Sequence, residues 1–233
     1  MEYVKTGIAG FDAATEGGIP KGTRTLLYGG PGTGKTVFAM QYLWTGLQEG
    51  NLVALNDQDR PIDFTRNYFR SFGWDLAPFE KGKKFFPLQS FGQDSEFPKE
   101  KIAKYLAPGD LAEWQTAARQ LATKKIDRLV IGDISQTDFA ELSSEWMTAS
   151  NNWMLNWTYF NSITAIEIIT ATQVDVEGHK LWSKYLKAAQ NIIQFRFQEG
   201  RREIRILKME GTTHPLYWLP MEITANGIEV GVT

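Results

Sequence analysis

The chain has 233 residues, 42% of them hydrophobic, with 27 acidic residues against 25 lysines and arginines. This length can bury a full core, and we expect one domain spanning residues 1–233. The formal net charge is −2, so the chain has no overall excess of positive charge, and the composition argues against a nucleic-acid partner. Because the sequence contains no cysteine, disulfides and thiolate metal sites are excluded.

The sequence offers no segment for membrane insertion. Residues 1–12 lack an apolar stretch of signal-peptide length, and nowhere do apolar residues run for the roughly 20 positions that a spanning helix needs. We therefore expect a soluble cytoplasmic protein with no membrane partner.

The first 22 residues are rich in turn formers. Glycines recur at positions 7, 10, 17, 18 and 22, which leaves few places for a helix longer than one turn. We expect this lead-in segment to wrap a surface rather than to form core.

Residues 29–36 read G-x-x-x-x-G-K-T, the pattern of a Walker A phosphate-binding loop. A β-prone run, residues 23–28, precedes the loop, and residues 37–47 follow with apolar side chains at helical spacing, so the context is strand, loop and helix. The glycines let backbone N–H groups converge on phosphate oxygens at the start of a helix, where the dipole favours anions. The predicted nucleotide-binding residues are Gly30, Pro31, Gly32, Thr33, Gly34, Lys35 and Thr36.

Two side chains of this motif indicate the ligand. Lys35 would reach the β- and γ-phosphates, and the hydroxyl of Thr36 would bind the Mg²⁺ that bridges them. We therefore predict ATP and Mg²⁺ as cofactors. The alternative is a glycine-rich turn that binds nothing.

Downstream of the loop helix, apolar runs alternate with helical patterns, which implies a parallel sheet. Strands are predicted at residues 52–56, 85–90, 129–131 and 163–170, and helices at 61–71, 110–124 and 141–161. The last of these helices carries Trp146, Trp153 and Trp157, which we interpret as core or interface residues, with a ligand-binding role as the alternative.

Beyond residue 180 the pattern changes to short strands separated by turns. These strands are predicted at residues 191–197, 203–209, 216–223 and 228–232, and they read as antiparallel hairpins. We therefore predict an α/β fold whose mainly parallel central sheet is flanked by helices and extended by C-terminal antiparallel strands.

Five segments, taken in order, resemble one family. They are TGIAGFDAATEGGIPKGT at 6–23, YGGPGTGKTVFAMQYLWTGLQEG at 28–50, FGWDL at 72–76, KMEGTTH at 208–214 and ITANGIEV at 223–230. This ordered set is similar to the KaiC-like ATPases of archaea and bacteria, within the RecA-like class of P-loop proteins. The resemblance covers nearly the whole chain. It implies a RecA-like core, ATP with Mg²⁺, and homo-oligomeric rings, usually hexamers, with nucleotide at the subunit interfaces.

The chain departs from the family pattern after its second strand. The family usually carries two adjacent glutamates there, one of which polarises the attacking water, whereas this chain has Gln58 and Asp59. A carboxylate that is one methylene shorter is misplaced by about 1 Å, which can cost on the order of a hundredfold in rate. Asp59, with Gln58 beside it, is the candidate catalytic base. An equal alternative is that Asp59 caps the helix opened by Pro61.

A second departure lies at the end of the fourth strand. The family's magnesium-binding aspartate follows the apolar run directly, whereas here Gly132 precedes Asp133. A shift of one residue reverses the face of a strand, but glycine accommodates a bulge that could turn Asp133 back toward the metal. We favour Asp133 as a magnesium partner, with a solvated carboxylate as the alternative. Gln173 resembles the residue with which RecA-like proteins sense the γ-phosphate. The alternative is that Gln173 is only a polar residue that caps the end of the fifth strand.

A third departure concerns the family's K-M-R-G-T signature, whose lysine and arginine resemble fingers that reach the neighbouring subunit's γ-phosphate. This chain retains the lysine as Lys208 but carries Glu210 in place of the arginine. A carboxylate near a triphosphate is repelled, and an arginine finger is worth roughly 10³ to 10⁵ in turnover. The resemblance therefore implies slow hydrolysis, with Lys208 as the remaining trans contact.

Three functions stay open at this stage. The first is a slow Mg²⁺-dependent ATPase that acts as a nucleotide-controlled switch or ring assembly, and the second is a non-hydrolysing ATP-binding scaffold. The third, a RecA-like DNA-binding motor, is favoured only by a local run of basic residues, which is usually a solvated face or a subunit edge. That run comprises Lys180, Lys184, Lys187, Arg196, Arg201, Arg202, Arg205 and Lys208. The sequence identifies no protein partner.

Overall fold

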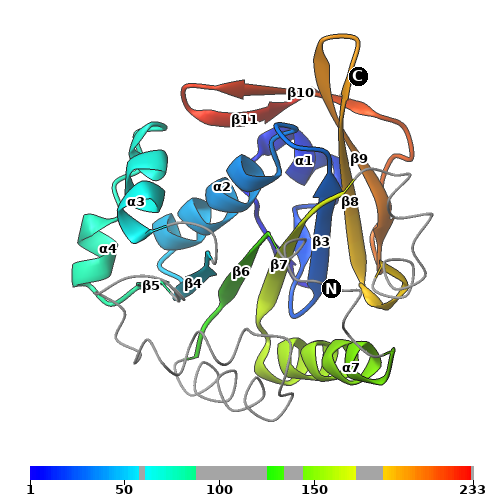
Figure 1. Ribbon diagram of the computed structural model, residues 1–233, viewed down its shortest axis with the longest axis horizontal. Helices are drawn as coiled ribbons and strands as arrows, with labels where there is room; N and C mark the ends of the chain where they lie inside the picture. Colours follow the sequence, from blue (N-terminus) through cyan, green and yellow to red (C-terminus); the bar gives the residue numbers. More distant parts are fainter. Residues whose placement is uncertain (58–60, 88–124, 134–143, 172–185, 232–233) are drawn as a thin grey trace.

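Strand β3 (Arg24–Gly29), in which all six residues are buried, lies at the centre of a nine-stranded sheet (Figure 1). The structure, a computed structural model, describes residues 1–57, 61–87, 125–133, 144–171 and 186–231. The strand order is β11-β10-β9-β8-β3-β7-β6-β4-β5. The other strands of this sheet are β4 (Val53–Asn56), β5 (Phe85–Pro87), β6 (Arg128–Asp133), β7 (Thr164–Thr170), β8 (Asn191–Gln198), β9 (Arg201–Met209), β10 (Leu219–Thr224) and β11 (Gly227–Val230).

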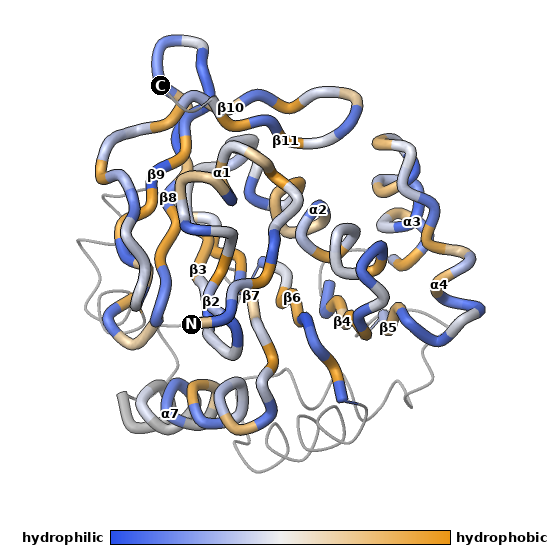
Figure 2. Tube along the Cα trace, turned by 180° about the vertical axis from the view of Figure 1, so that it is seen from behind, coloured by the Kyte–Doolittle hydropathy of each residue, from blue (hydrophilic) through white to orange (hydrophobic). Residues whose placement is uncertain are grey.

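The sheet combines a parallel and an antiparallel part. Strands β8, β3, β7, β6, β4 and β5 are parallel, and β9, β10 and β11 extend the sheet as antiparallel strands. Strands β3 and β4 are buried along their whole length, whereas β9 mixes buried and exposed residues, as expected where one face of a sheet meets solvent. Figure 2 shows both hydrophilic and hydrophobic residues along β9. The predicted α/β fold, with antiparallel strands at the C-terminal end, is confirmed.

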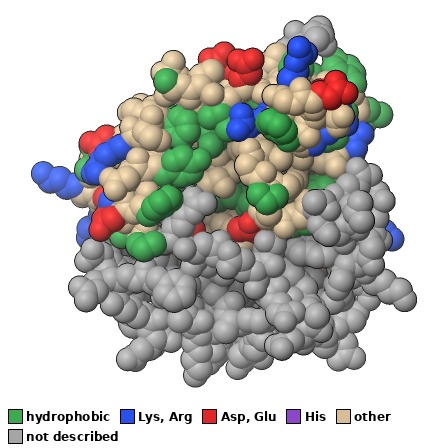
Figure 3. Space-filling model, turned by 45° about the horizontal axis from the view of Figure 1, so that its top comes forward, with side chains coloured by type: hydrophobic (Ala, Val, Ile, Leu, Met, Phe, Trp, Pro, Cys, Tyr) green, Lys and Arg blue, Asp and Glu red, His purple; other side chains and the backbone are tan. Residues whose placement is uncertain are grey.

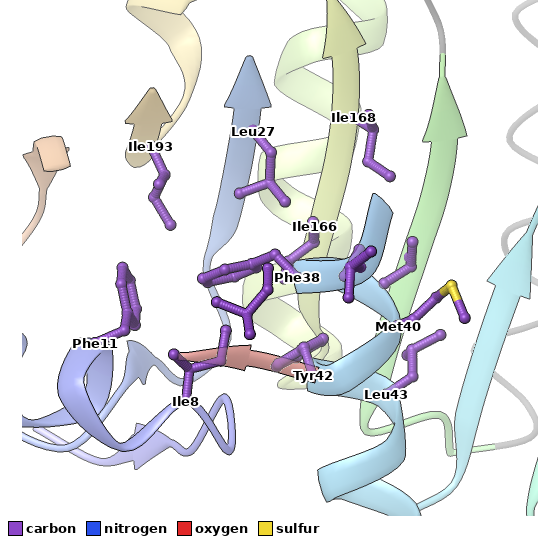
Figure 4. Close-up of a cluster of buried hydrophobic side chains, with 14 of the residues drawn as sticks. Ile8, Phe11, Leu27, Phe38, Met40, Tyr42, Leu43, Ile166, Ile168 and Ile193 are labelled. Atoms are coloured by element: carbon purple, nitrogen blue, oxygen red, sulfur yellow. The ribbon is translucent and has the colours of Figure 1, made fainter. Parts of the chain in front are cut away.

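Helices cover both faces of the sheet. Helix α2 (Lys35–Gln48) packs on one face, where Phe38 and its neighbours point toward the apolar side chains of β3 and β7 (Figure 4). Helix α7 (Ser144–Asn161) packs on the other face through Met154 and Trp157. Because side chains alternate along a strand, Ile166 joins the α2 cluster and Ala165 joins the α7 cluster. The remaining described helices are α1 (Ala9–Ala14), α3 (Ile62–Arg70) and α4 (Ala77–Lys81).

The lead-in segment forms core, so the prediction that it only wraps a surface was wrong. Ile8, Phe11 and Ile19 are fully buried, and the Phe11 ring packs edge-on against Phe38 with centroids 5.1 Å apart. The segment folds inward because the carboxylate of Asp12 accepts hydrogen bonds from the start of the same segment. Its short strands β1 (Tyr3–Val4) and β2 (Ile19–Pro20) form a separate pair.

Most predicted elements occur near their expected places. Helix α3 matches the prediction for residues 61–71, and Gly73 follows it with a φ of 75°. Trp157 is buried, which confirms its core role, whereas the side chains of Trp146 and Trp153 lie outside the described part. The helix predicted at 110–124 and the end of the strand predicted at 85–90 also lie outside it. Helix α4 was not predicted. None of the described helices combines the length and the apolar character needed to cross a bilayer.

A buried ion pair links the two central strands β3 and β7. Arg24 and Glu167 have side-chain exposures of 0% and 1%, and their two parallel hydrogen bonds measure 2.8 and 2.9 Å. Arg24 Nη1 also donates to Asn151 Oδ1 on α7 at 2.6 Å. Buried charges of this kind must be paired, because an unpaired charge in the core is strongly destabilising. The sequence pattern did not indicate this pair.

We predict that Glu167→Ala lowers the free energy of unfolding by about 3–5 kcal/mol, because it leaves the Arg24 guanidinium buried without its carboxylate. Urea unfolding measures the change. The matched control is Glu203→Ala, which removes a partly exposed carboxylate 2.6 Å from Arg196 and should cost less than about 1 kcal/mol. Equal losses in the two variants would contradict a special role for the buried pair.

Candidate nucleotide-binding site

The loop between β3 and α2 lies where the parallel strands end, the edge at which α/β sheets bind ligands (Figure 1). Its backbone is held in a conformation that requires glycine. Gly32 and Gly34 have φ angles of 72° and 107°, and a Cβ on Gly34 would lie 2.8 Å from Met221 Cε. Thr33 Oγ1 donates to the carbonyl of Gly30 at 2.8 Å and closes the turn. The strand, loop and helix context predicted for the Walker A pattern is present.

A cavity of about 630 Å³ opens beside this loop. This volume lies within the range of roughly 300–1,000 Å³ typical of small-molecule sites. Its walls come from the loop and α2, from the ends of β4, β6 and β7, from α3, and from β9 and β10. The lining residues are Pro31, Gly32, Gly34, Lys35, Thr36, Val37, Ala39, Met40, Leu55, Asp57, Thr65, Tyr68, Val130, Gly132, Asp133, Ile168, Thr170, Arg202 and Ile223.

Lys35 turns back over its own loop. Only 5% of its surface is exposed, and Nζ donates to the carbonyl oxygens of Gly29 and Gly30, each at 2.8 Å. Burial lowers the pKa of Lys35 to about 8, although the negative charge of Asp133 opposes that shift. The side chain is therefore a cation that is poorly solvated, which is the state in which an anionic ligand would stabilise it most.

Asp133 reaches the cavity through an irregularity of β6. The register between β6 and β7 shifts between Ile131 and Asp133, so the bulge expected at Gly132 is present. Asp133 Oδ1 accepts a hydrogen bond from the backbone N–H of Thr170 at 3.1 Å, and Asp133 lines the same cavity as Lys35 and Thr36. The bulge thus places the carboxylate where a magnesium partner would be needed, and its binding of the metal stays a prediction.

Several lining residues were not identified as site residues from the sequence. Asp57 accepts a hydrogen bond from Thr65 Oγ1 of α3 at 3.0 Å, and Tyr68 lies one turn further along that helix. Arg202 of β9 was noticed only as part of a basic run. The signal that could have distinguished it is alternation, because Arg202 shares its face of the strand with the buried residues Ile204 and Ile206.

Other predicted site residues are not brought together by the described chain. Gln58, Asp59 and Gln173 lie outside the described residues, so their roles stay predictions. Lys208 does not line the cavity. Its Nζ donates to the carbonyl of Ala189 at 2.7 Å and lies 2.9 Å from Glu210 Oε1.

A family model described as "ATPase: KaiC" matches residues 4–233. The chain belongs to the KaiC ATPase family. KaiC-type chains are ATP-binding P-loop ATPases, so the resemblance predicted from the five segments is confirmed, and nucleotide binding is a property of the family.

Relatives of the KaiC family match along the whole chain. A UPF0273 protein of Thermotoga maritima is 32% identical over 243 aligned positions, which cover 99% of this chain and 96% of that protein. The circadian clock protein KaiC3 of Synechocystis is 29% identical over 96% of this chain, which corresponds to 44% of KaiC3. A crystal structure of a KaiC-like protein from Pyrococcus horikoshii superposes with a TM-score of 0.79 at 28% identity and covers 99% of both chains.

We predict that the affinity for ATP falls as the pH rises through about 8, because the free protein then loses the Lys35 proton whereas bound phosphate would restore it. Because only one proton is linked to binding, the affinity for ATP can fall by at most about tenfold per pH unit. Calorimetry in two buffers of different ionisation enthalpy should detect uptake of a proton on binding above that pH.

The control for this experiment is Lys35→Arg, whose guanidinium stays protonated throughout the range. Whatever its absolute affinity, this variant should show little change with pH. An unmodified protein whose ATP affinity is constant from pH about 7 to about 9.5 would contradict the assignment to Lys35.

Proposed function

We propose that the chain forms one ATP-binding domain, residues 1–233, that binds Mg²⁺·ATP in the cavity beside the β3–α2 loop and hydrolyses it slowly as a nucleotide-controlled switch. The observation that carries this proposal is the convergence of Lys35, Thr36 and Asp133 on one cavity. A buried ammonium, a hydroxyl at the start of a helix and a carboxylate form the donor set that a metal-bound triphosphate requires.

The residues present fit both parts of the ligand. The positive-φ glycines leave the backbone of the loop open to phosphate oxygens, and Thr36 and Asp133 would hold the metal with the phosphates. Bound Mg²⁺ would supply charge neutralisation for the phosphoryl group. Within the described residues no cluster of three His, Cys, Asp or Glu side chains exists, which agrees with a metal that takes most of its ligands from phosphate and water.

Two substitutions support slow hydrolysis. The family's glutamate pair is replaced by Gln58 and Asp59, which leaves a shorter carboxylate as the candidate base. The position of the trans arginine is occupied by Glu210, whose carboxylate lies 2.9 Å from Lys208 within the same chain. Lys208, the only cation of the signature that this chain retains for a contact with a neighbouring subunit, is therefore held in an ion pair within its own chain. If the replaced glutamate pair and the replaced arginine together abolish hydrolysis, the chain is a nucleotide-binding scaffold, which is the second candidate function.

We further propose that the chain assembles into a homo-oligomeric ring, with six subunits as the size that the family resemblance implies, in which Lys208 approaches the nucleotide of the next subunit. The support is that Lys208 lies away from the cavity of its own chain and is about 39% exposed, so a contact with nucleotide requires a second copy. A protein partner that reads the nucleotide state is part of the switch proposal, and its identity stays open.

The structure gives little support to a DNA-binding motor. Arg196 pairs with Glu203 at 2.6 Å, Arg205 donates to Gln194 at 2.7 Å, and Lys208 pairs with Glu210. On the described surface, the end of the molecule that carries the strand tips mixes acidic, basic and apolar side chains (Figure 3). Arg196 and Lys208 are thus each paired with a carboxylate, which makes these two cations less able to displace counterions from a phosphate backbone.

We predict that Lys35→Ala raises the dissociation constant for Mg²⁺·ATP by about a hundredfold or more, because the β- and γ-phosphates lose their main side-chain cation. Isothermal calorimetry tests this. The control is Lys84→Ala, which removes an ammonium bonded to the carbonyl of Gly50 and should leave affinity unchanged. A folded Lys35→Ala variant with normal affinity would show that the loop is only a turn.

We also predict that steady-state ATP turnover is well below the enzyme median of about 10 s⁻¹, because the water-activating glutamate and the trans arginine are both replaced. If the base limits the rate, Asp59→Glu raises turnover at constant ATP affinity. If the missing positive charge from the neighbouring subunit limits the rate, Glu210→Arg raises turnover. A parent protein that turns over at an ordinary rate would rule out the slow-switch proposal.

A further inference from the structure

Arg202 connects the β8–β9 hairpin to the phosphate-binding loop. It lies near the start of β9, opposite Phe197 of β8 and Met221 of β10, so strands on both sides fix its backbone. Its Nε donates to the carbonyl oxygen of Gly32 at 3.1 Å. Thus a residue 170 positions from the loop in sequence contacts the middle of the predicted phosphate cradle.

The rest of the guanidinium is available for a ligand. Arginine carries five N–H donors in a planar fork, and the bond to Gly32 engages only Nε. Among the described residues, no acceptor is hydrogen-bonded to the Nη groups and no carboxylate lies within ion-pair distance of them. The Phe197 ring lies 5.7 Å from the guanidinium carbon and supports it from one side.

This arrangement differs from that of Arg196 and Arg205, two other arginines of the basic run. Arg196 has a carboxylate partner at 2.6 Å, and Arg205 donates to the side chain of Gln194. Both also stack on the Trp218 indole, at 4.0 and 4.5 Å from its centroid. Arg202 instead lines the cavity of Lys35 and bonds to a neutral carbonyl, which does not compensate its charge.

We propose that Arg202 is a phosphate-contacting residue that acts in cis, through its Nη groups, on the polyphosphate of a nucleoside di- or triphosphate. This inference rests on the proposed function of the cavity. Arg202 and Lys35 then approach the phosphates from different elements, the hairpin and α2. Because β9 also carries Lys208 and leads to Glu210, the contact ties the nucleotide to the strand that would face a neighbouring subunit.

The test compares Arg202→Gln with Arg201→Gln, which removes the same charge from the adjacent, exposed position on the other side of β9. The probes are Mg²⁺·ATP and Mg²⁺·tripolyphosphate, measured by calorimetry on the full chain. We expect Arg202→Gln to weaken both about 10- to 100-fold, as for loss of a charged hydrogen bond, and Arg201→Gln to change either by less than about twofold.

A second measurement separates a phosphate contact from a merely structural latch on Gly32. Screening by salt weakens an ionic contact, so the parent protein should lose more ATP affinity between about 0.1 and about 0.5 M salt than Arg202→Gln does. A structural latch would leave that salt dependence unchanged. Should Arg202→Gln fail to fold, Arg202→Lys keeps the charge and the aliphatic stem but lacks the fork, and it should bind with intermediate affinity.

Each remaining outcome overturns a distinct statement. If Arg202→Gln matches Arg201→Gln for both probes, Arg202 does not contact phosphate, although Lys35→Ala can still abolish binding and leave the proposed function intact. If Arg202→Gln weakens ATP but not tripolyphosphate, the contact is with the nucleoside and the assignment is wrong. If the parent protein binds neither probe, the proposed function itself fails.

Discussion

The packing of α2 against the parallel strands is the constraint on which the site depends. Ten residues of α2 are buried, and the seven apolar ones from Val37 to Leu47 form one core with β3, β7 and the lead-in segment. This packing fixes the start of the helix at the end of β3, so the backbone of the intervening loop has little freedom. Because β4, β6 and β7 end at the same edge, Asp57, Asp133 and Thr170 meet the loop there. The chemistry of the cavity follows from where these strands end.

Much of this arrangement could be predicted from the sequence, because its signals are local. The loop pattern, the apolar runs and the hairpin turns each depend on residues close in the chain, and the bulge at Gly132 depends on one glycine. The lead-in was misjudged for the same reason, since its glycines indicate turns whereas the burial of Phe11 depends on Phe38 of a distant helix. Arg202 was missed as a site residue because its contact with Gly32 is formed only by the fold.

The charges of the chain show how the fold separates structural from binding roles. Arg24 is buried on the α7 side of the sheet, where Glu167 compensates its charge and Asn151 accepts one of its hydrogen bonds. Lys35 and Arg202 lie at the cavity and are bonded to backbone carbonyls. A carbonyl satisfies a donor without neutralising its charge, so each of these two cations keeps its charge for an anionic ligand. Basic residues thus stabilise the fold in the core, and at the cavity they remain able to bind an anion.

The pair between Arg24 and Glu167 has a consequence for the response of this sheet to heat. Hydration of charged groups becomes less favourable as temperature rises, so the cost of keeping two charges out of water falls while their attraction remains. The two central strands and α7, which Arg24 joins through Asn151, are therefore held by an interaction whose net contribution grows on warming. We expect the centre of the sheet to be the last region to loosen as the protein approaches its melting temperature, after the edge strands have begun to separate.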